Sequence, residues 1–471
     1  MLPPDSRQLF HDLLAPPCGW SLDGAMGTTY SLDLESLIMV PLAFMRQAGR
    51  WEENETPDPV ALLAALRRHA GQLTVFCQAG QVALSGSFPR LSQLMEPCVH
   101  EVLAPHREGV FHPKVWILRF VFRGDDEEEE ERKAGQVRYR VLVMSRNLTM
   151  DRSWDLAVAL EGDYRDDRQR AYAQNHPLAD FVKALPSLAC RDLPEHRRQS
   201  VERMAEELRR VEFEMPDEFE PGEFLFQPTG FDPAQTPVNP LDYQIDRMLA
   251  VSPFLNESWL REAQQSCNEI HLISRQESLD ALSLDCLQKC ASLHTLHRQA
   301  SVGEEDVDDL LQGLHAKCLV MDAGWNTHWR LGSHNATTSA WHRNVEFSVG
   351  FTAKRSTHGV EKILSASKKS AGEMLFADLL TPYLLESRSA AIEEDEAWKR
   401  QCLKTRRAIA EAHFYWDVSE REDGQFSCRL DCESEPDGLH EFGALAVRPM
   451  SVSEAWQRRV LPAGAAEFPN L

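Results

Sequence analysis

The chain has 471 residues, of which 43% are hydrophobic and 26% charged, a balance that is typical of a folded globular protein and excludes general disorder. This length exceeds one ordinary core and predicts two or three domains. Fifty Lys and Arg against 73 Asp and Glu give a net charge of −23, which disfavours sliding along nucleic acid but permits a local basic groove.

The sequence contains no predicted membrane segment. The longest apolar candidate, Leu37 to Phe44, is interrupted by Pro41 and is shorter than the roughly 20 residues of a spanning helix. The first residues, MLPPDSRQLF, lack the basic start and apolar stretch of a secretory signal. The 11 cysteines are scattered without metal-ligand spacing. We therefore expect a cytoplasmic protein with reduced thiols, no metal and no membrane association.

The first third of the chain predicts a helix followed by strands. Apolar residues at helical spacing predict a helix within 31–45, and 73–84 indicates a strand that runs into a turn. Further strands are expected at Val115–Phe122, at Val137–Met144 and near Trp154–Leu160. The acidic run between the first two of these predicts a solvated hairpin excursion, with a docking surface as the alternative.

A second α/β stretch follows a charged helical region that ends near Phe213. The Pro-rich, acidic segment Glu214–Pro240 lacks sustained periodicity and predicts a linker. Strands are then expected within four segments: 247–255, 269–275, 317–322 and 344–351. The last part predicts a helical stretch over about 360–407 and a β-hairpin at about 413–432.

These patterns divide the chain into four parts. We expect a first lobe over 1–165, a helical segment and linker over 166–240, a second lobe over 241–390, and a C-terminal helix with a small β extension over 391–471. The order of strands and motifs is the same in both lobes, which indicates an internal repeat. The predicted fold is therefore α/β, with two lobes of mixed sheets flanked by helices that form a pseudo-dimer.

The same residue types recur in each lobe, within FHPKVWILRF and SRNL in the first and within LHAKCLVMD and GSHN in the second. These residues are His112, Lys114, Ser145 and Asn147 in the first lobe, and His315, Lys317, Ser333 and Asn335 in the second. Residues i and i+2 of a strand face the same side, so each His projects with its Lys. A two-fold axis between the lobes would bring two imidazoles, two ammonium groups and two amides together, a set that suits phosphodiester chemistry.

The paired HxK…SxN arrangement resembles the phospholipase D superfamily. Its fuller signature, HxKxxxxD followed by GSxN, is matched in the second lobe, where Asp322 follows Lys317. In the first lobe Arg119 stands at the equivalent position. The reduced first motif, with SRNL, is similar to that of tyrosyl-DNA phosphodiesterases. The resemblance covers about 21–162 and 241–383, and not the linker or the tail.

This resemblance implies hydrolysis through a covalent phosphohistidine, without metal or cofactor, at one site between the lobes. The catalytic residues would be the two His, two Lys and two Asn, with His112 as nucleophile and His315 as general acid and then base; the reverse assignment stays open. Asp155 and Glu346 would each orient a His, with a solvated strand residue as the alternative. Asp322 would have a structural or supporting role, and Ser145 and Ser333 would either donate to the phosphate or stabilise their turns.

The motif does not name the substrate, since lipid and nucleic-acid enzymes share it. The absence of an anchor and the arginines near the motifs (Arg146, Arg152, Arg330 and Arg343) favour DNA or RNA over phospholipid. The resemblance implies a nuclease of an antiviral defence system that acts with a helicase or another subunit. The alternative is a non-catalytic nucleic-acid-binding or scaffold subunit of such a complex, with Asp125–Glu131 as a docking surface; a phospholipase is less favoured.

Other residues near the motifs are given structural roles. Trp154 and Trp341 are expected to be core aromatics beneath the two turns, with stacking on a base as the alternative. The additional histidines are expected on the surface or in loops, and these are His106, His328, His334 and His342.

Overall fold

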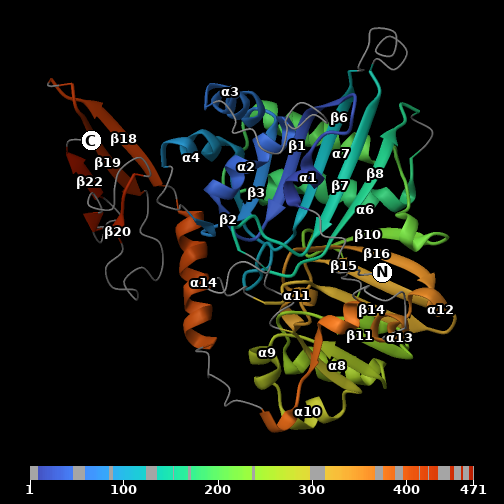
Figure 1. Ribbon diagram of the computed structural model, residues 1–471. Coiled ribbons are helices and arrows are strands. Elements are labelled where there is room, and N and C mark those ends of the chain that lie inside the picture. Colours follow the sequence, from blue (N-terminus) through green and yellow to red (C-terminus); the bar gives the residue numbers. More distant parts are fainter. Residues whose placement is uncertain are drawn as a thin grey trace.

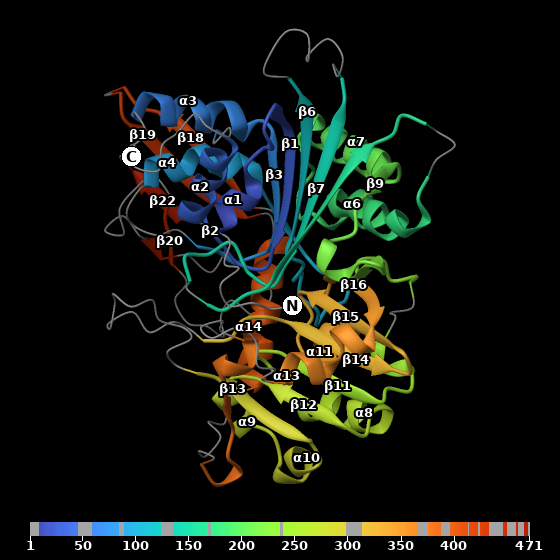
Figure 2. The same ribbon diagram turned by 45° about the vertical axis from the view of Figure 1, so that its right-hand side comes forward.

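The computed structural model describes residues 9–45, 59–83, 89–123, 135–151, 153–167, 171–235, 239–297, 313–365, 375–387, 396–412, 414–422, 424–432, 446–449, 458–459 and 466–469. Its architecture is mixed α/β, with a seven-stranded and an eight-stranded sheet flanked by helices (Figure 1). Figure 2 shows the two sheets as two lobes, one above the other. This confirms the predicted fold class of two α/β lobes.

The first sheet has the strand order β5-β3-β1-β6-β7-β8-β9. Its strands are β1 (Trp20–Thr29), β3 (Leu73–Gln78), β5 (Val99–Val102), β6 (Val115–Phe122), β7 (Val137–Met144), β8 (Ala157–Tyr164) and β9 (Val211–Phe213). The first three strands are parallel, and β6 to β9 are antiparallel to their neighbours. The β-branched and aromatic residues of VWILRFVF favour an extended, doubly covered strand at the centre.

The second sheet repeats this topology in the order β13-β12-β11-β14-β15-β16-β10, with β17 added beside β13. Its strands are β10 (Glu223–Thr229), β11 (Arg247–Val251), β12 (Ile270–Ile273), β13 (Ser292–Leu296), β14 (Cys318–Ala323), β15 (Asn326–Gly332), β16 (Glu346–Lys354) and β17 (Leu380–Pro382). Strands β11, β12 and β13 are again parallel, and the HxK strand β14 is antiparallel to β11 as β6 is to β1. The predicted internal repeat is therefore visible in the strand order.

Helices cover the first sheet on both faces. One face carries α1 (Phe10–Leu14), α2 (Leu34–Met45), α3 (Pro59–Ala70) and α4 (Pro89–Met95), and the other carries α6 (His176–Leu188) and α7 (Glu195–Leu208). Trp116, Leu118 and Phe120 of β6 pack in the core on the α2 face, whereas Val115 and Ile117 face α6 and α7. This alternation explains why β6 is hydrophobic at every position but one.

The second lobe has shorter helices. They are α8 (Glu257–Ser266), α9 (Gln276–Asp280), α10 (Leu284–Gln288), α11 (Thr338–His342), α12 (Arg355–His358) and α13 (Val360–Leu364). The lobes share one hydrophobic core, in which Phe181 of α6 lies 5.1 Å from Phe347 of β16 and 5.7 Å from Phe231, ring centroid to ring centroid. Buried aromatic contacts of this kind fix the orientation of one lobe relative to the other.

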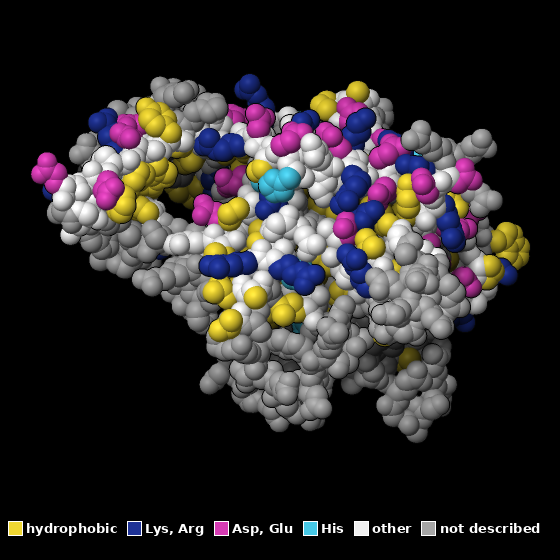
Figure 3. Space-filling model, turned by 90° about the horizontal axis from the view of Figure 1, so that it is seen from above, with side chains coloured by type: hydrophobic (Ala, Val, Ile, Leu, Met, Phe, Trp, Pro, Cys, Tyr) yellow, Lys and Arg dark blue, Asp and Glu magenta, His cyan; other side chains and the backbone are white. Residues whose placement is uncertain are grey.

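The C-terminal part contributes no strand after β17 to either large sheet among the described residues. It consists of α14 (Glu396–Glu411), a small sheet of β18 (Phe414–Glu420), β19 (Phe426–Cys432) and β22 (Ala466–Pro469), and the pair β20 (Ala446–Val447) and β21 (Arg458–Arg459). Another two-stranded sheet, in the first lobe, pairs β2 (Leu32–Asp33) with β4 (Val82–Ala83). The predicted hairpin is confirmed by β18 and β19. Figure 3 shows hydrophobic side chains gathered at one end of the molecule. Exposed apolar residues of the small C-terminal sheet include Tyr415, Val418 and Phe426.

The structure differs from the sequence predictions at several elements. The segment expected as a linker contains β10, an edge strand of the second sheet, and the helical region before it packs on the first sheet. The helical stretch expected over 360–407 is interrupted by β17. The acidic run at 125–131 lies outside the described residues. None of the described helices is long and apolar enough to cross a membrane.

Candidate active site

Both HxK motifs lie where the lobes meet, and the backbone of one lobe holds the other. The amide of His112, just before β6, donates to the carbonyl of Val345 at 2.8 Å, and the amide of His315, just before β14, donates to Trp154 at 3.0 Å. These hydrogen bonds belong to two inter-lobe β-bridges, Phe111 with Val345 and Leu314 with Trp154. The two contacts are equivalent under the pseudo-two-fold relation, so each His is held next to the other lobe's acidic strand.

Each imidazole is paired with a carboxylate from the opposite lobe. His112 Nδ1 lies 2.8 Å from Glu346 Oε2, and His315 Nδ1 lies 2.8 Å from Asp155 Oδ1. Both His side chains are 12% exposed, whereas Glu346 is fully buried and Asp155 is 13% exposed. The expected orienting acids are thus in contact with the histidines, and neither pair can form within one lobe.

The two serines hold these carboxylates in place. Ser145 Oγ donates to Asp155 Oδ1 at 2.8 Å and accepts from the amide of Leu156 at 2.9 Å. Ser333 Oγ donates to Glu346 Oε2 and accepts from the amide of Phe347 at 2.9 Å. A hydroxyl that both donates and accepts has a fixed direction, so each acid presents one oxygen to its His.

The two motif lysines are both buried. Lys114 is fully buried and Lys317 is 1% exposed, and each donates to the carbonyl of its own motif histidine, at 3.0 Å for His112 and 2.7 Å for His315. Burial lowers the pKa of Lys317 to about 8, and burial together with the Lys317 charge holds the pKa of Lys114 well below its usual range. Each ammonium group retains two N–H donors for an anion.

Both predicted amides have an oxygen without a hydrogen-bond partner. Within the part of the chain that the structure describes, the buried Oδ1 atoms of Asn147 and Asn335 have no hydrogen bond. An unsatisfied buried amide costs about 1–3 kcal/mol, and the same cost occurs at equivalent positions of both lobes. Because rotation by 180° exchanges the oxygen for the NH₂ group, these amides are suited to donate to a bound anion.

The protonation states follow from the charges around each pair. Burial lowers the pKa of His112 to about 4 despite the adjacent Glu346 carboxylate, and burial also lowers the pKa of His315. Burial would raise the pKa of Glu346, but His112 and its hydrogen bond lower it to about 2. At neutral pH each carboxylate is ionised and accepts from Nδ1–H of a neutral imidazole. The Nε2 lone pair of each ring is then free.

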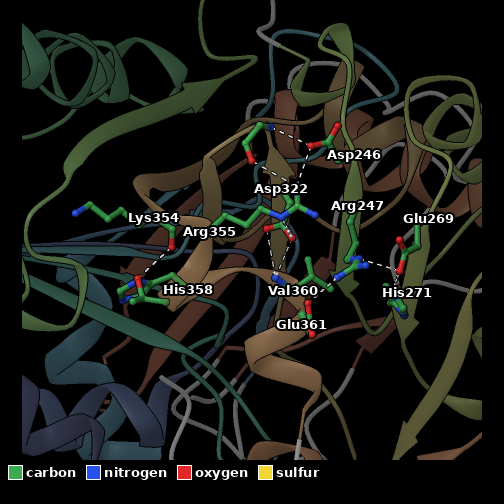
Figure 4. A network of polar contacts seen from close by, with 12 residues as sticks. Asp246, Arg247, Glu269, His271, Asp322, Lys354, Arg355, His358, Val360 and Glu361 are labelled. Atoms are coloured by element: carbon green, nitrogen blue, oxygen red, sulfur yellow. Dashed lines mark hydrogen bonds and ion pairs between the residues drawn. The ribbon is translucent and has the colours of Figure 1, made fainter.

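Asp322 is not part of this cluster. It lies toward the far end of β14, where both carboxylate oxygens accept from the amide of Val360 at 3.3 Å and one lies 3.4 Å from Arg355 Nε (Figure 4). It therefore caps α13 and pairs with Arg355, contacts that correspond to a structural role. Arg119, its counterpart in the first lobe, instead donates to Glu207 at 2.7 and 3.0 Å and to Asp23 at 2.7 Å.

The described arginines near the motifs contact other groups of the protein. Arg343 donates to Glu108 at 2.7 Å, Arg146 donates to the carbonyls of Thr149 and Asp151, and Arg330 lies over the Trp341 ring at 5.7 Å. Arg152 lies outside the described residues. Trp341 is buried in the core as predicted, and Trp154 packs on Phe376 at 5.3 Å.

One histidine expected on the surface is buried. His334 is 8% exposed, stacks on Trp341 at 4.3 Å between ring centroids, and places Nε2 3.1 Å from Thr229 Oγ1. Burial lowers its pKa to about 4, so it is neutral. The reason is local, because the turn after β15 directs the His334 side chain inward against Trp341 of α11. The sequence pattern does not reveal this direction.

Sequence reasoning missed three residues around the motifs. Tyr30 meets the His112 ring edge-on at 5.3 Å between centroids. Gln78 at the end of β3 accepts from the amide of Phe111 at 2.6 Å, and Arg275 after β12 donates to the carbonyl of Leu314 at 2.7 Å. The last two hold the residue before each motif His from equivalent strands. Their only sequence signal is a polar residue at the end of a buried strand.

The donor set of this site is suited to an anion. The two lobes contribute two neutral imidazoles, two buried ammonium groups, two carboxylates and two amides whose Oδ1 atoms have no hydrogen bond. Among the described residues, no group of three or more His, Cys, Asp or Glu side chains is arranged to hold a metal ion. A phosphodiester would bring its single negative charge to donors on both sides.

Comparison with known proteins finds no matching family model and no matching curated protein. Among solved structures, similar chains include a yeast tyrosyl-DNA phosphodiesterase mutant (12% identity, TM-score 0.40, 73% of this chain and 84% of that chain). A polyphosphate kinase from Porphyromonas gingivalis (11%, 0.30, 83% and 43%) and a phosphatidylserine synthase from Haemophilus influenzae (11%, 0.34, 73% and 79%) are also similar. These similarities are too distant to assign an activity to this chain.

Proposed function

We propose that this protein is a metal-independent phosphodiesterase of the phospholipase D type, and that it cleaves DNA or RNA through a phosphohistidine. The observation that carries the proposal is the pair of imidazole–carboxylate contacts that cross the lobe interface, His112 with Glu346 and His315 with Asp155. Each leaves Nε2 free beside a buried lysine. A nucleophile and a general acid at one phosphate require two such imidazoles.

In the first step, Nε2 of His112 attacks phosphorus while the bond between phosphorus and the leaving oxygen breaks. His315 in its protonated form transfers the Nε2 proton to that oxygen, so the leaving group departs as an alcohol. The Glu346 carboxylate stabilises the positive charge that develops on the His112 ring. Lys114, Lys317 and the two amides donate to the non-bridging oxygens, whose negative charge they oppose throughout.

In the second step, His315 is neutral and accepts a proton from water as the water oxygen attacks phosphorus. The bond between phosphorus and His112 Nε2 breaks, which returns the free imidazole and releases a phosphomonoester. Atoms and charge balance over the two steps, since the proton given to the leaving group is recovered from water. The reverse assignment of the two histidines uses the same atoms and is decided by which ring carries the phosphoryl group.

The cellular setting is part of the proposal and rests on the sequence resemblance. We place the protein in the cytoplasm, away from membranes, as a component of an antiviral defence system that acts with a helicase or another subunit. The proposed division is two lobes over 1–165 and 241–390, joined by 166–240 and followed by a C-terminal extension over 391–471. The net charge of −23 is consistent with a substrate that a partner delivers.

The test is a cleavage assay in EDTA with labelled single- and double-stranded DNA and RNA, with His112→Ala and His315→Ala beside the wild type. The proposal predicts cleavage that persists in EDTA and is lost in both variants. Failure of the wild type to cleave any of these substrates would contradict the nuclease assignment. Headgroup release from phosphatidylcholine vesicles would then favour a phospholipase, and nucleic-acid binding without cleavage would favour a scaffold subunit.

A further inference from the structure

The C-terminal helix α14 lies against the first lobe beside its HxK motif. Arg407 Nη1 donates to the carbonyls of Ala104 at 3.1 Å and His106 at 3.3 Å, in the segment that leads to His112. Arg407 is itself held by Glu411 at 2.8 Å. Two hydrogen bonds to main-chain carbonyls fix this part of the helix relative to the site, although α14 belongs to neither repeat (Figure 1).

The neighbouring Arg406 lies against the turn that follows β3. A β-carbon placed on Gly80 would lie 3.6 Å from Cβ and Cγ of Arg406, so the stem of this arginine rests on the Gly80 turn. The next residue, Gln81, donates from Nε2 to the Tyr30 hydroxyl at 3.2 Å, and Tyr30 meets the His112 ring. Contacts therefore lead from Arg406 through the turn at Gly80 and Gln81 to Tyr30 and His112.

Arg406 is available for a ligand. Its side chain is exposed, and among the described residues it forms no ion pair. Its positive charge nevertheless acts on Tyr30. Burial raises the pKa of the Tyr30 hydroxyl, and the charge of the Arg406 guanidinium opposes that rise. The stem is ordered by Gly80 while the head is free, an arrangement that loses little side-chain entropy when an anion binds.

We propose that Arg406 binds the phosphate next to the scissile one, so that α14 and Tyr30 form a subsite for a nucleic-acid strand. The inference rests on the proposed function and specifies its substrate. A nucleic-acid strand carries a phosphate at every nucleotide, whereas a phosphatidylcholine molecule carries a single phosphodiester and has no group for Arg406. Guanidinium recognises phosphate through paired N–H donors, which makes the contact specific as well as attractive.

The test compares Arg406→Gln with wild type on two substrates, a labelled single-stranded oligonucleotide and bis(p-nitrophenyl) phosphate, which has one phosphodiester. The ratio of the oligonucleotide KM to the KM of the small diester is expected to rise about tenfold, as loss of one charged hydrogen-bonding group predicts. The slope of log KM against log salt for the oligonucleotide is expected to fall by about 0.7, the value for one phosphate of a single strand.

Lys404→Gln is the matched control. Lys404 is exposed, lies on the same helix and carries the same charge, but two residues correspond to about 200° around α14, so it lies on the other side of the helix. A response of Lys404→Gln equal to that of Arg406→Gln would overturn the subsite, since it would report only the net charge of the helix. An unchanged KM ratio in Arg406→Gln would overturn it as well.

The outcomes separate this inference from the proposed function. If the wild type hydrolyses both substrates and the ratio does not respond, the subsite is wrong and the phosphodiesterase stands. If the wild type hydrolyses neither, the function fails, and the subsite is tested by fluorescence anisotropy with the same oligonucleotide. There, equal affinity and an equal salt slope for wild type and Arg406→Gln would overturn the subsite. Thermal unfolding of both variants checks that they fold.

Discussion

Glu346→Gln is the substitution whose effect follows most directly from the geometry. The side chain is fully buried, and its carboxylate accepts from His112 Nδ1 at 2.8 Å, from Ser333 Oγ and from Asn344 Nδ2 at 3.0 Å. Glutamine has nearly the same shape but carries an NH₂ group in place of one oxygen. If that group meets His112 Nδ1, the ring must accept there and carry its proton on Nε2, which removes the nucleophile.

The expected magnitude comes from the lost charge interaction. With about 4 Å between the charge centres and an effective dielectric constant of about 20, a carboxylate stabilises an imidazolium by about 4 kcal/mol. Each 1.36 kcal/mol is a factor of ten in rate, so kcat is expected to fall about 10³-fold. The tautomer change acts in the same direction. KM should stay within about threefold, because a carboxylate with no exposed surface does not touch the substrate.

The assay is single-turnover cleavage of a labelled oligonucleotide in EDTA, with excess enzyme, for wild type and Glu346→Gln. Glu108→Gln is the matched control, since Glu108 is an exposed acid paired with Arg343 and should leave kcat unchanged. A Glu346→Gln rate above about a tenth of wild type would refute the role given to the buried charge, because it would leave less than about 1.4 kcal/mol for the interaction. A loss confined to KM would refute it equally.

Three further outcomes follow from the same contacts. The pH profile of kcat/KM should be bell-shaped with its maximum between about pH 4 and 6.5, since the free protein needs His112 neutral and His315 protonated, and burial lowers both pKa values; an optimum above pH 8 would contradict this. Lys317→Met should abolish cleavage yet raise the free energy of unfolding at pH 7, on the order of 2 kcal/mol. Because burial lowers the pKa of Lys317 to about 8, the charged ammonium destabilises the folded protein below pH 8, and this destabilisation disappears as pH rises to about 10.5. Urea titrations at pH 7 and 10 measure the difference, and a variant less stable than wild type at pH 7 would contradict it. Asp322→Ala should lower the free energy of unfolding by about 1–3 kcal/mol, because the α13 cap and the Arg355 contact are lost, while kcat changes by less than about threefold. A large loss of kcat in folded protein would contradict a purely structural role for Asp322.

The parts of the fold that the sequence predicts are those in which local pattern and burial agree. The central strands β6 and β7 have the bounds expected from their runs of β-branched and aromatic residues. Strand β10 was missed because an acidic, Pro-containing edge strand receives its stability from pairing with β16, which its own residues do not encode. Strand β1, WSLDGAMGTT, was missed for a related reason, since its glycines allow close packing of Trp116 and carry no β propensity.

In the candidate site too, some features follow from the sequence pattern and others depend on the tertiary structure. Recurrence of the motif indicates that the histidines, lysines and asparagines share a site, because two copies of one pattern imply two equivalent positions. The crossing of the pairs, with Glu346 on His112 and Asp155 on His315, depends on how the lobes dock and cannot be derived from spacing. Asp322 shows the opposite case, in which a residue inside the motif spacing supports a helix at the far end of its strand.

The most direct test of the central claim is to trap the covalent intermediate. A labelled oligonucleotide that ends in a p-nitrophenyl phosphodiester is mixed with the His315→Ala variant. The p-nitrophenolate departs without a general acid, whereas the variant lacks the group that activates water, so the adduct accumulates. The protein is then quenched, digested and mapped by mass spectrometry. The account predicts an acid-labile phosphoryl adduct on His112, at the nitrogen that does not face Glu346, and no adduct in His112→Ala. Turnover by wild type without any adduct in His315→Ala, or cleavage that survives in His112→Ala, would contradict it.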